Sequence, residues 1–453
     1  MIDFTLEEVH AFVSAFVSLV RHRGWSRVLV AGDLRESTPA ILDKVVRSFQ
    51  GLGWEVWTGG GVPTPALAWG CATYGVPGVM VTGSHIPADR NGLKFYFPEG
   101  EILKSDEEAI LKLYSEIKGA VNAIPQHAHP VQVRDLAALF SDRYTENFPA
   151  QSLAGLRIGF YSHSSAGRDL FPQILRMLGA EVVEFGRSEV FVPVDTEAVE
   201  SIDDLHQNLL RHSLQVVVST DGDADRPLVL CEDGRVVPGE ILGLITSKFL
   251  GVETVVYPVS CSSVLQDSGW IPDCSITRIG SPFVLGRMLE RLKEAPSRRV
   301  AGFEANGGYL LGSALGGLSP LMTRDSLLPI LCFLLSMKSQ GWIRSSDMLR
   351  PFDGVVNLSG LIKDFPQERS ALALLRFREA LNGGAEFAGL IGLGALQSLN
   401  ELDGVRARFD SGITVHLRPS GNAPEFRLYI EAKTRPDAER VLGFFENWVR
   451  SLC

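Results

Sequence analysis

The sequence predicts an α/β protein in which strands and helices alternate in three successive parts, followed by a smaller α+β part. Short apolar runs such as 27–31 and 79–81 alternate with stretches of helical periodicity, which favours helices packed on largely parallel sheets. The alternation restarts near residues 156 and 254. From about residue 353 hairpin-connected strands replace it, which is typical of an α+β arrangement.

The first part begins with a helix, and its last predicted strand is followed by a turn that contains a serine. Residues 5–8 have the spacing of a capping box before an amphipathic stretch. Apolar runs that end in glycine or a polar turn indicate buried strands. In order, the expected elements are helix 5–23, strand 27–31, helix 38–52, strand 55–57 and strand 79–81.

The later parts repeat this alternation before the tail changes it. The expected elements are strand 156–161, helix 169–178, strands 181–185 and 215–219, strands 254–258 and 299–303, the hairpin 406–409/413–417, strand 426–432 and helix 436–452. The hairpin is predicted from its Asp-Ser-Gly turn. We therefore expect domains at 1–140, 141–243, 244–352 and 353–453, with boundaries accurate to about eight residues.

Composition narrows the class of protein. The chain has 453 residues, of which 45% are hydrophobic and 21% charged, enough for several buried cores. The net charge of −10 argues against a nucleic-acid partner. Six cysteines without C-x-x-C spacing indicate reduced thiols. The longest apolar run, 327–337, is too short for a membrane span and the N-terminus lacks a basic signal region, so we expect a cytoplasmic protein without a membrane partner.

The sharpest local signal is the D-x-D-x-D sequence of Asp221, Asp223 and Asp225, between two apolar runs. Three alternating carboxylates repel one another unless a cation lies among them, and oxygen ligands favour Mg²⁺ or Ca²⁺. Arg226 occupies the position where an EF-hand needs glycine, so an EF-hand is excluded. An exposed acidic turn and the D-x-D site of a glycosyltransferase remain alternatives for this motif alone.

A second signal follows the strand at 79–81. Ser84 lies in a glycine-containing turn that exposes its hydroxyl, and His85 and Lys94 are available for proton transfer or positive charge. A capping serine beside a surface histidine is an equally good explanation of this turn by itself.

A third signal is the G-F-E-A-N-G-G sequence after strand 299–303. Glu304 and Asn306 offer hydrogen-bonding groups for sugar hydroxyls, and the glycines allow a ligand close to the backbone. A plain turn at the end of a strand is the alternative.

A fourth signal is R-P-S-G-N-A-P-E-F-R, between two predicted strands. Its turn can form an anion-binding nest, and two arginines add phosphate donors. A surface hairpin with solvated arginines is the alternative. The candidate phosphate-binding residues are Arg418, Ser420, Gly421, Asn422 and Arg427.

These four loops, in the order serine, metal, sugar, phosphate, resemble the α-D-phosphohexomutase superfamily, and within it the bacterial phosphomannomutases. The resemblance spans nearly the whole chain and implies three similar α/β domains and a smaller α+β domain around one cleft. It implies that Ser84 is the phosphoserine, that the three aspartates and a Ser84 oxygen bind one Mg²⁺, and that Glu304 contacts the sugar hydroxyl that distinguishes epimers. It also matches Asp33 and Arg35 to a D-x-R segment near the phosphoserine.

The implied activity is that of an isomerase, an intramolecular phosphotransferase. It would interconvert mannose 6-phosphate and mannose 1-phosphate through a hexose 1,6-bisphosphate, which also primes the serine. Mg²⁺ and Arg226 would spread the charge of the transferring phosphoryl group. The expected assembly is a monomer or homodimer. Glucose or glucosamine phosphates as substrates, and a catalytically impaired sugar-phosphate-binding relative, are the alternatives.

Some positions depart from the commoner family pattern. The serine loop reads T-G-S-H-I-P where T-A-S-H-N-P is usual, and Pro282 stands where many members have a substrate-binding lysine. Asn422 replaces a common threonine. The chain begins within the first helix region, without the strand and arginine-bearing turn that normally precede it, so the first domain is expected to be N-terminally short.

Overall fold

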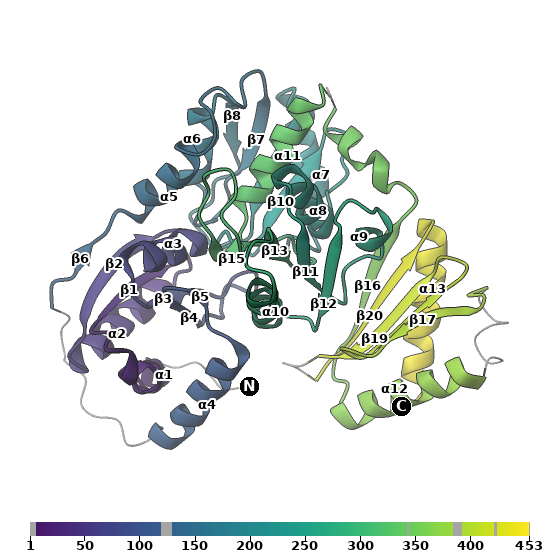
Figure 1. Cartoon of the computed structure of the whole chain (residues 1–453), viewed down its shortest axis with the longest axis horizontal. Helices are drawn as coiled ribbons and strands as arrows, with labels where there is room; N and C mark the ends of the chain where they lie inside the picture. Colours follow the sequence, from purple (N-terminus) through teal and green to yellow (C-terminus); the bar gives the residue numbers. More distant parts are fainter. Residues whose placement is uncertain (1–5, 119–128, 342–343, 384–391, 421–423, 453) are drawn as a thin grey trace. The chain divides into compact units, whose positions relative to one another are not determined.

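In a computed structural model of the protein, the described residues form four β-sheets with flanking helices (Figure 1). The structure describes residues 6–118, 129–341, 344–383, 392–420 and 424–452. The chain divides into two compact units. The larger comprises Met1–Tyr257, Trp270–Ser275 and Gly280–Met348, and the smaller comprises Pro258–Gly269, Ile276–Ile279 and Leu349–Cys453.

The first sheet has the strand order β5-β4-β3-β1-β2-β6. Its strands are β1 (Arg27–Gly32), β2 (Glu55–Gly61), β3 (Gly78–Val81), β4 (Leu93–Phe97), β5 (Gly100–Glu101) and β6 (Gln132–Val133). Its helices are α1 (Leu6–Val20), α2 (Thr38–Gly51), α3 (Thr64–Tyr74), α4 (Lys104–Ile117) and α5 (Leu136–Thr145), with the 3₁₀ turn η1 (Arg21–Arg23) after α1. β1 pairs in parallel with β2 and β3, whereas β4 is antiparallel to β3.

The core of this sheet explains the order of its elements. β1 and β3 are buried along almost their whole length, as continuous apolar strands covered on both faces are. One face packs on apolar side chains of α1 and α2, among them Phe16 and Phe49. β3 then delivers its polar C-terminal turn, residues 82–85, to the edge where the carboxyl ends of the parallel strands meet.

The second sheet has the order β10-β9-β7-β8. Its elements are β7 (Arg157–Tyr161), α6 (Leu170–Met177), β8 (Glu181–Phe185), α7 (Ile202–Arg211), β9 (Val216–Thr220) and β10 (Pro227–Cys231), followed by α8 (Gly239–Leu250). β9 and β10 are both fully buried and pair antiparallel. The acidic loop 221–226 is therefore the tip of a buried hairpin, which fixes its position.

The third sheet has the order β12-β11-β13-β14-β15. Its elements are β11 (Thr254–Pro258), α9 (Val264–Asp267), β12 (Asp273–Thr277), α10 (Ser281–Glu294), β13 (Val300–Phe303), β14 (Tyr309–Leu311), β15 (Leu321–Asp325) and α11 (Leu327–Ser339), followed by the 3₁₀ segment η2 (Ser345–Phe352). The apolar run 327–337 forms α11, whose residues from Leu327 to Leu334 are all buried. No helix of the described residues is both long enough and apolar enough to cross a membrane.

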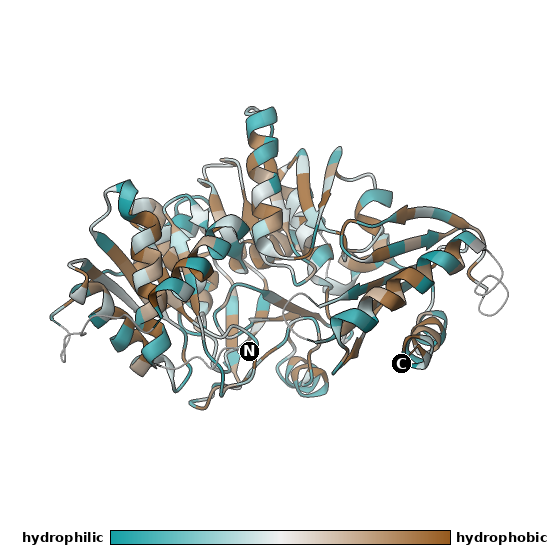
Figure 2. Ribbon diagram, turned by 90° about the horizontal axis from the view of Figure 1, so that it is seen from below, coloured by the Kyte–Doolittle hydropathy of each residue, from teal (hydrophilic) through white to brown (hydrophobic). Residues whose placement is uncertain are grey.

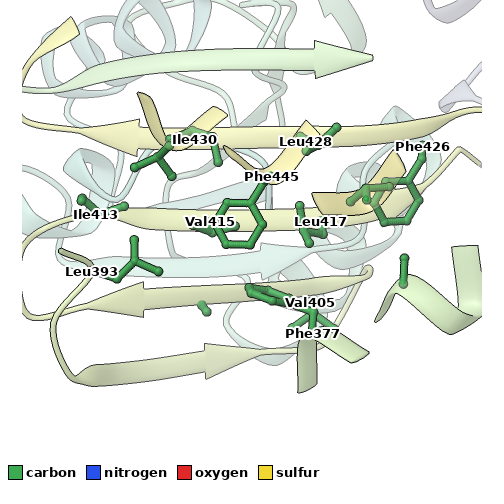
Figure 3. Packing of buried hydrophobic residues seen from close by; sticks show 14 of the residues in the cluster. Phe377, Leu393, Val405, Ile413, Val415, Leu417, Phe426, Leu428, Ile430 and Phe445 are labelled. Atoms are coloured by element: carbon green, nitrogen blue, oxygen red, sulfur yellow. The ribbon is translucent and has the colours of Figure 1, made fainter. Parts of the chain in front are cut away.

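The smaller unit is built on an antiparallel sheet of order β16-β20-β19-β18-β17. Its elements are β16 (Val356–Ile362), α12 (Gln367–Gly383), β17 (Leu396–Asn400), β18 (Val405–Phe409), β19 (Thr414–Pro419), β20 (Phe426–Ala432) and α13 (Arg435–Ser451). Alternate residues of β19 and β20, including Leu417 and Leu428, pack beside Phe445 of α13 (Figure 3). This period-2 burial is what a sheet with one covered face requires.

Two short segments outside the C-terminal sequence, Pro258–Gly269 and Ile276–Ile279, also belong to the smaller unit. The hydroxyl groups of Ser262 and Ser263 both donate hydrogen bonds to the Glu431 carboxylate, and the backbone N–H of Ser263 donates a third. The carboxylate of Asp267 accepts two hydrogen bonds from Arg408. The unit is therefore assembled from residues far apart in the sequence.

The predicted fold class is confirmed: mixed α/β sheets precede a C-terminal antiparallel sheet. Every strand and helix range predicted from the sequence coincides with an observed element within a few residues, although Thr5 lies outside the described residues. Figure 2 shows apolar and polar residues interleaved along the helices, which is the pattern from which they were predicted. The expected domain boundaries near 140 and 243 lie within α5 and α8, and the one near 353 follows η2.

Candidate active site

Ser84 lies in the turn after β3, next to the acidic loop. Its hydroxyl donates a hydrogen bond of 2.7 Å to Oδ2 of Asp221, and its backbone N–H donates to the Thr82 hydroxyl at 2.8 Å. The residue is 7% exposed and has φ 52, a left-handed conformation unusual for any residue but glycine. Such strained backbone persists only where the surroundings hold it, and it is concentrated at functional sites.

Arg35 provides much of the restraint that keeps this backbone in place. The residue is 1% exposed, and its Nε donates to Oδ2 of Asp33 at 3.1 Å. Its four Nη hydrogens donate to backbone carbonyls of the serine loop, those of Ser84, Ile86, Pro87 and Arg90, at 2.6–2.9 Å. All five guanidinium N–H groups are thus occupied by the protein. The guanidinium therefore orients the loop and has no donor left for a ligand.

The three aspartates of the acidic loop converge. Asp221, Asp223 and Asp225 are each fully buried, and each offers a carboxylate oxygen within 4.8 Å of the others. Oδ1 of Asp221 accepts hydrogen bonds from the backbone N–H groups of Asp225 and Arg226, so the loop folds around its first carboxylate. Ala224 has φ 59, and this left-handed residue closes the turn.

Cations balance part of this buried charge. Nζ of Lys94 lies 2.7 Å from Oδ2 of Asp223 and 2.8 Å from Oδ2 of Asp225. The hydroxyl of Thr64 donates a further hydrogen bond of 2.5 Å to Oδ2 of Asp223. Burial lowers the pKa of Lys94, but the two carboxylates outweigh burial and raise it above its ordinary value. Lys94 is therefore a fixed positive charge near neutral pH.

The carboxylates respond differently to their surroundings. Burial, and then the charges of Asp225 and Asp223, raise the pKa of Asp221 well above its ordinary value. Burial also acts on Asp225, but the positive charges of Arg324 and Lys94 outweigh it and hold the pKa of Asp225 below its ordinary value.

The acidic cluster fits a divalent cation. Oδ1 of Asp223 and Oδ1 of Asp225 are buried and have no hydrogen-bond partner, although each carboxylate's other oxygen is bonded to a cation. Buried carboxylate oxygens are rarely left unsatisfied. Three carboxylates with a serine hydroxyl form the all-oxygen donor set that Mg²⁺ prefers.

His85 and Arg226 face each other beside this cluster. Nη1 of Arg226 donates to Nδ1 of His85 at 2.9 Å, and its Nε lies 3.7 Å from Oδ1 of Asp225. Burial and the positive charge of Arg226 lower the pKa of His85 to about 4. The imidazole is therefore neutral at pH 7, and because Nδ1 accepts a hydrogen bond, Nε2 carries the proton.

Glu304 and Asn306 occupy the turn between β13 and β14, and each is 7% exposed. Gly307 has φ +83, which glycine adopts without strain, and Oδ1 of Asn306 accepts a hydrogen bond of 3.0 Å from the backbone N–H of Gly308. Oε2 of Glu304 accepts a hydrogen bond of 2.9 Å from Nη1 of Arg324.

Arg324, in β15, was missed by the sequence analysis. Its Nη2 lies 2.7 Å from Oδ2 of Asp225 while its Nη1 bonds Glu304, so one guanidinium joins the metal loop to the sugar loop. The sequence signal for this residue was weak, because β15 reads Leu-Met-Thr-Arg-Asp and only its first two residues are apolar. The arginine is recognisable as an ion-pair partner once its burial is known, because charged residues are seldom buried without a partner.

The fourth motif lies in the smaller unit. Arg418 of β19 and Arg427 of β20 are directly opposite in the antiparallel ladder. Like charges directly opposite each other repel, and Glu425, 3.5 Å from Arg427, balances part of this charge, so the pair is compatible with a further anion beside it. Nε of Arg418 lies 3.1 Å from Asp403, and the backbone N–H of Ser420 bonds to the carbonyl of Glu425. Gly421 and Asn422 lie outside the described residues.

Comparisons with known proteins agree on one family. Sequence models described as “Phosphoglucomutase/phosphomannomutase” match residues 2–120 (alpha/beta/alpha domain I), 138–234 (alpha/beta/alpha domain II) and 374–447 (C-terminal domain). A curated phosphomannomutase of Salmonella muenchen is 38% identical over 451 residues, covering 97% of this chain and 91% of the relative. A phosphomannomutase of Sinorhizobium fredii is 38% identical over 447 residues, covering 95% and 93%.

A solved structure supports the fold. A phosphoglucomutase/phosphomannomutase family protein from Burkholderia thailandensis superposes with a TM-score of 0.78. The match covers 99% of this chain and 94% of that one, at 19% sequence identity.

Proposed function

The chain belongs to the phosphoglucomutase/phosphomannomutase family, and we propose that it is a phosphomannomutase that interconverts mannose 6-phosphate and mannose 1-phosphate through a phosphoserine at Ser84. The observation that carries this proposal is the direct hydrogen bond between the Ser84 hydroxyl and the buried aspartate cluster. A D-x-D site of a glycosyltransferase has no need of this serine. The arrangement favours transfer between Ser84 and the substrate.

In the proposed reaction a sugar hydroxyl attacks the phosphorus of phosphoserine. A new P–O bond forms to the sugar while the P–O bond to Oγ of Ser84 breaks, and the proton of the sugar hydroxyl ends on Oγ. Oδ2 of Asp221 accepts the hydrogen bond of that serine hydroxyl. Reversal from the other phosphate of the hexose 1,6-bisphosphate restores phosphoserine and completes the isomerisation.

Asp221, Asp223, Asp225 and one oxygen of the phosphoserine at Ser84 would hold one Mg²⁺ per chain. When bound, it supplies electrostatic stabilisation of the transferring phosphoryl group. Lys94 and Arg226 add fixed positive charges around the same group. Because Lys94 stays protonated, we assign it charge stabilisation rather than proton acceptance. The Nε2–H of neutral His85 is a hydrogen-bond donor for a phosphoryl or substrate oxygen.

We assign the remaining site residues to substrate binding and positioning. Glu304 and Asn306 are assigned to sugar hydroxyls. Arg35, whose donors are taken by Asp33 and by carbonyls of the serine loop, is a positioning residue rather than a catalytic one. In the smaller unit, the phosphate that does not react is assigned to Arg418, Ser420, Gly421, Asn422 and Arg427. The division into domains at 1–140, 141–243, 244–352 and 353–453 is part of this proposal, as are a monomer or homodimer and hexose 1,6-bisphosphate as the activator.

The test is the phosphorylation state of Ser84. Intact mass is measured before and after incubation with mannose 1,6-bisphosphate and Mg²⁺, and peptide mapping locates the modification. We expect a gain of about 80 Da on Ser84 that disappears when mannose 6-phosphate is added. Ser84→Ala should remove both the mass gain and turnover.

Ser213 provides the matched control. It is another serine with a left-handed backbone, φ 51, but it lies in the exposed turn that follows α7. Ser213→Ala should keep the mass gain. No phosphorylation of the wild-type chain would contradict the mutase and favour a binding-only relative. A higher kcat/KM with glucose 1-phosphate or glucosamine 1-phosphate than with mannose 1-phosphate would reassign the substrate.

A further inference from the structure

Arg324 is a buried cation that stands between two functional loops. Its side chain is 10% exposed and belongs to β15, on the opposite side of β14 from the sugar loop's strand. Nη2 lies 2.7 Å from Oδ2 of Asp225 and Nη1 lies 2.9 Å from Oε2 of Glu304. Burial lowers the pKa of Arg324, but the charges of Asp225, Glu101 and Glu304 outweigh burial and raise it, so the guanidinium is always charged.

The two contacts select which oxygens remain for ligands. On Asp225, Oδ2 is taken by Lys94 and Arg324, which leaves Oδ1 buried and without a hydrogen-bond partner, 3.7 Å from Nε of Arg226. On Glu304, Arg324 and Asn306 both bond to Oε2. A single guanidinium thereby orients a metal-loop carboxylate and a sugar-loop carboxylate together.

The surroundings hold the arginine in this place. The backbone N–H of Arg324 and the hydroxyl of Thr323 both donate to Oε1 of Glu101, in strand β5. Gly308 leaves the space for the arginine's stem, because a Cβ there would lie 2.7 Å from Cδ and 2.8 Å from Cγ of Arg324. Neither contact is with a ligand, so both serve to place the guanidinium.

We propose that Arg324 is a positioning residue that couples metal binding at the aspartates to sugar binding at Glu304. This inference rests on the proposed function. A divalent cation on Asp225 repels the guanidinium and neutralises part of the charge of that carboxylate. The attraction between Arg324 and Asp225 weakens, and Arg324 bonds Glu304 more firmly. Glu304 is then already ordered when a sugar arrives, and the sugar phosphate binds more tightly. By linkage, the sugar phosphate tightens metal binding by the same factor.

The test is a binding measurement on dephosphorylated enzyme, in which no turnover occurs. The dissociation constant of mannose 6-phosphate is measured by calorimetry with and without saturating Mg²⁺ at constant ionic strength. For each protein, the coupling is the factor by which Mg²⁺ lowers the dissociation constant of mannose 6-phosphate. This factor should be at least about five times larger in the wild type than in Arg324→Gln. Mn²⁺ binding without sugar, followed by electron paramagnetic resonance, reports whether the metal site of each variant remains intact.

Three further variants separate bridging from charge and from folding. Arg324→Lys keeps the charge but cannot present two N–H groups in a fork, so it should lose the coupling as Arg324→Gln does. Gly308→Ala keeps the arginine but displaces its stem, and it should also lose the coupling. Arg287→Gln is the matched control, because Arg287 bridges Glu290 and Glu294 on the exposed face of α10, and it should retain wild-type coupling.

The outcomes are distinct. Wild-type coupling in Arg324→Gln or Gly308→Ala would overturn the inference and leave the mutase untouched. Coupling lost in Arg324→Gln but kept in Arg324→Lys would also overturn it, because charge and not bridging would then carry the effect. If the wild type bound no mannose 6-phosphate at all, both the proposed function and this inference would fall.

Discussion

Replacing Arg35 by lysine tests the idea that one guanidinium holds the serine loop. The native side chain makes five hydrogen bonds, one to Asp33 and four to carbonyl groups between residues 84 and 90. Lysine offers three N–H donors on a single nitrogen, so at least two of these bonds are lost. Hydrogen bonds that involve a charged group contribute about 1.5–3 kcal/mol each, so the loop should lose at least about 3 kcal/mol.

Such a loss has a measurable local consequence. Since about 1.4 kcal/mol corresponds to a factor of ten, the loop should open on the order of 100-fold more often. Hydrogen–deuterium exchange of a peptide covering residues 82–92 should accelerate by that factor in Arg35→Lys, while peptides from the smaller unit stay unchanged. Because Ser84 is aligned by the same loop, kcat should fall by about 100-fold.

The control lies in the same loop. Arg90 has an exposed side chain, and Arg90→Lys makes the same chemical change without removing any hydrogen bond of the Arg35 guanidinium. It should exchange and turn over like the wild type. If Arg35→Lys kept wild-type exchange across 82–92, the assignment of Arg35 as a positioning residue would be refuted.

Two further substitutions test other contacts. A methyl group at Gly222 would lie 2.8 Å from the carbonyl oxygen of Ser84, so Gly222→Ala should shift the serine from the metal loop and lower kcat by about 100-fold, whereas Gly92→Ala, whose methyl group has room, should not. Burial lowers the pKa of His416 to about 4 in the folded protein. Below about pH 6.5 this histidine therefore gains a proton in the unfolded protein but not in the folded one, and stability falls as the pH is lowered. Between pH 7 and 5 this histidine should cost about 2 kcal/mol of unfolding free energy, a pH dependence that urea titrations should find missing in His416→Gln.

The strands and loops of the site could be predicted from the sequence because their signals are local. The buried strands are short apolar runs; Ser84 lies in the turn three residues after β3, and Glu304 directly follows β13. In an α/β sheet, ligand-binding groups gather at the carboxyl ends of strands, so these positions carry information by themselves.

The charge pairing of the site could not be predicted in the same way. Lys94 bonds to a carboxylate 129 residues further along the chain, and Arg324 to one 20 residues before it. These contacts depend on sheet order and on hairpins such as β4–β5, and neither is encoded in a local pattern. For the same reason the D-x-R motif identified Arg35 but not its hydrogen bonds to the serine loop, which join two loops about 50 residues apart.

The composition of the smaller unit bears on how such proteins can recombine. Glu431 is 7% exposed and receives its hydrogen bonds from Ser262 and Ser263, which precede the C-terminal sequence by about 170 residues. A gene crossover after residue 348 would transplant the antiparallel sheet but leave those donors behind, with a buried carboxylate unsatisfied. Chimeras between relatives should therefore succeed when the segments 258–269 and 276–279 are inherited from the same parent as the C-terminal sheet. The C-terminal sequence looks like a module that could be exchanged alone, but the unit it forms consists of three separate segments of the chain that must be inherited together.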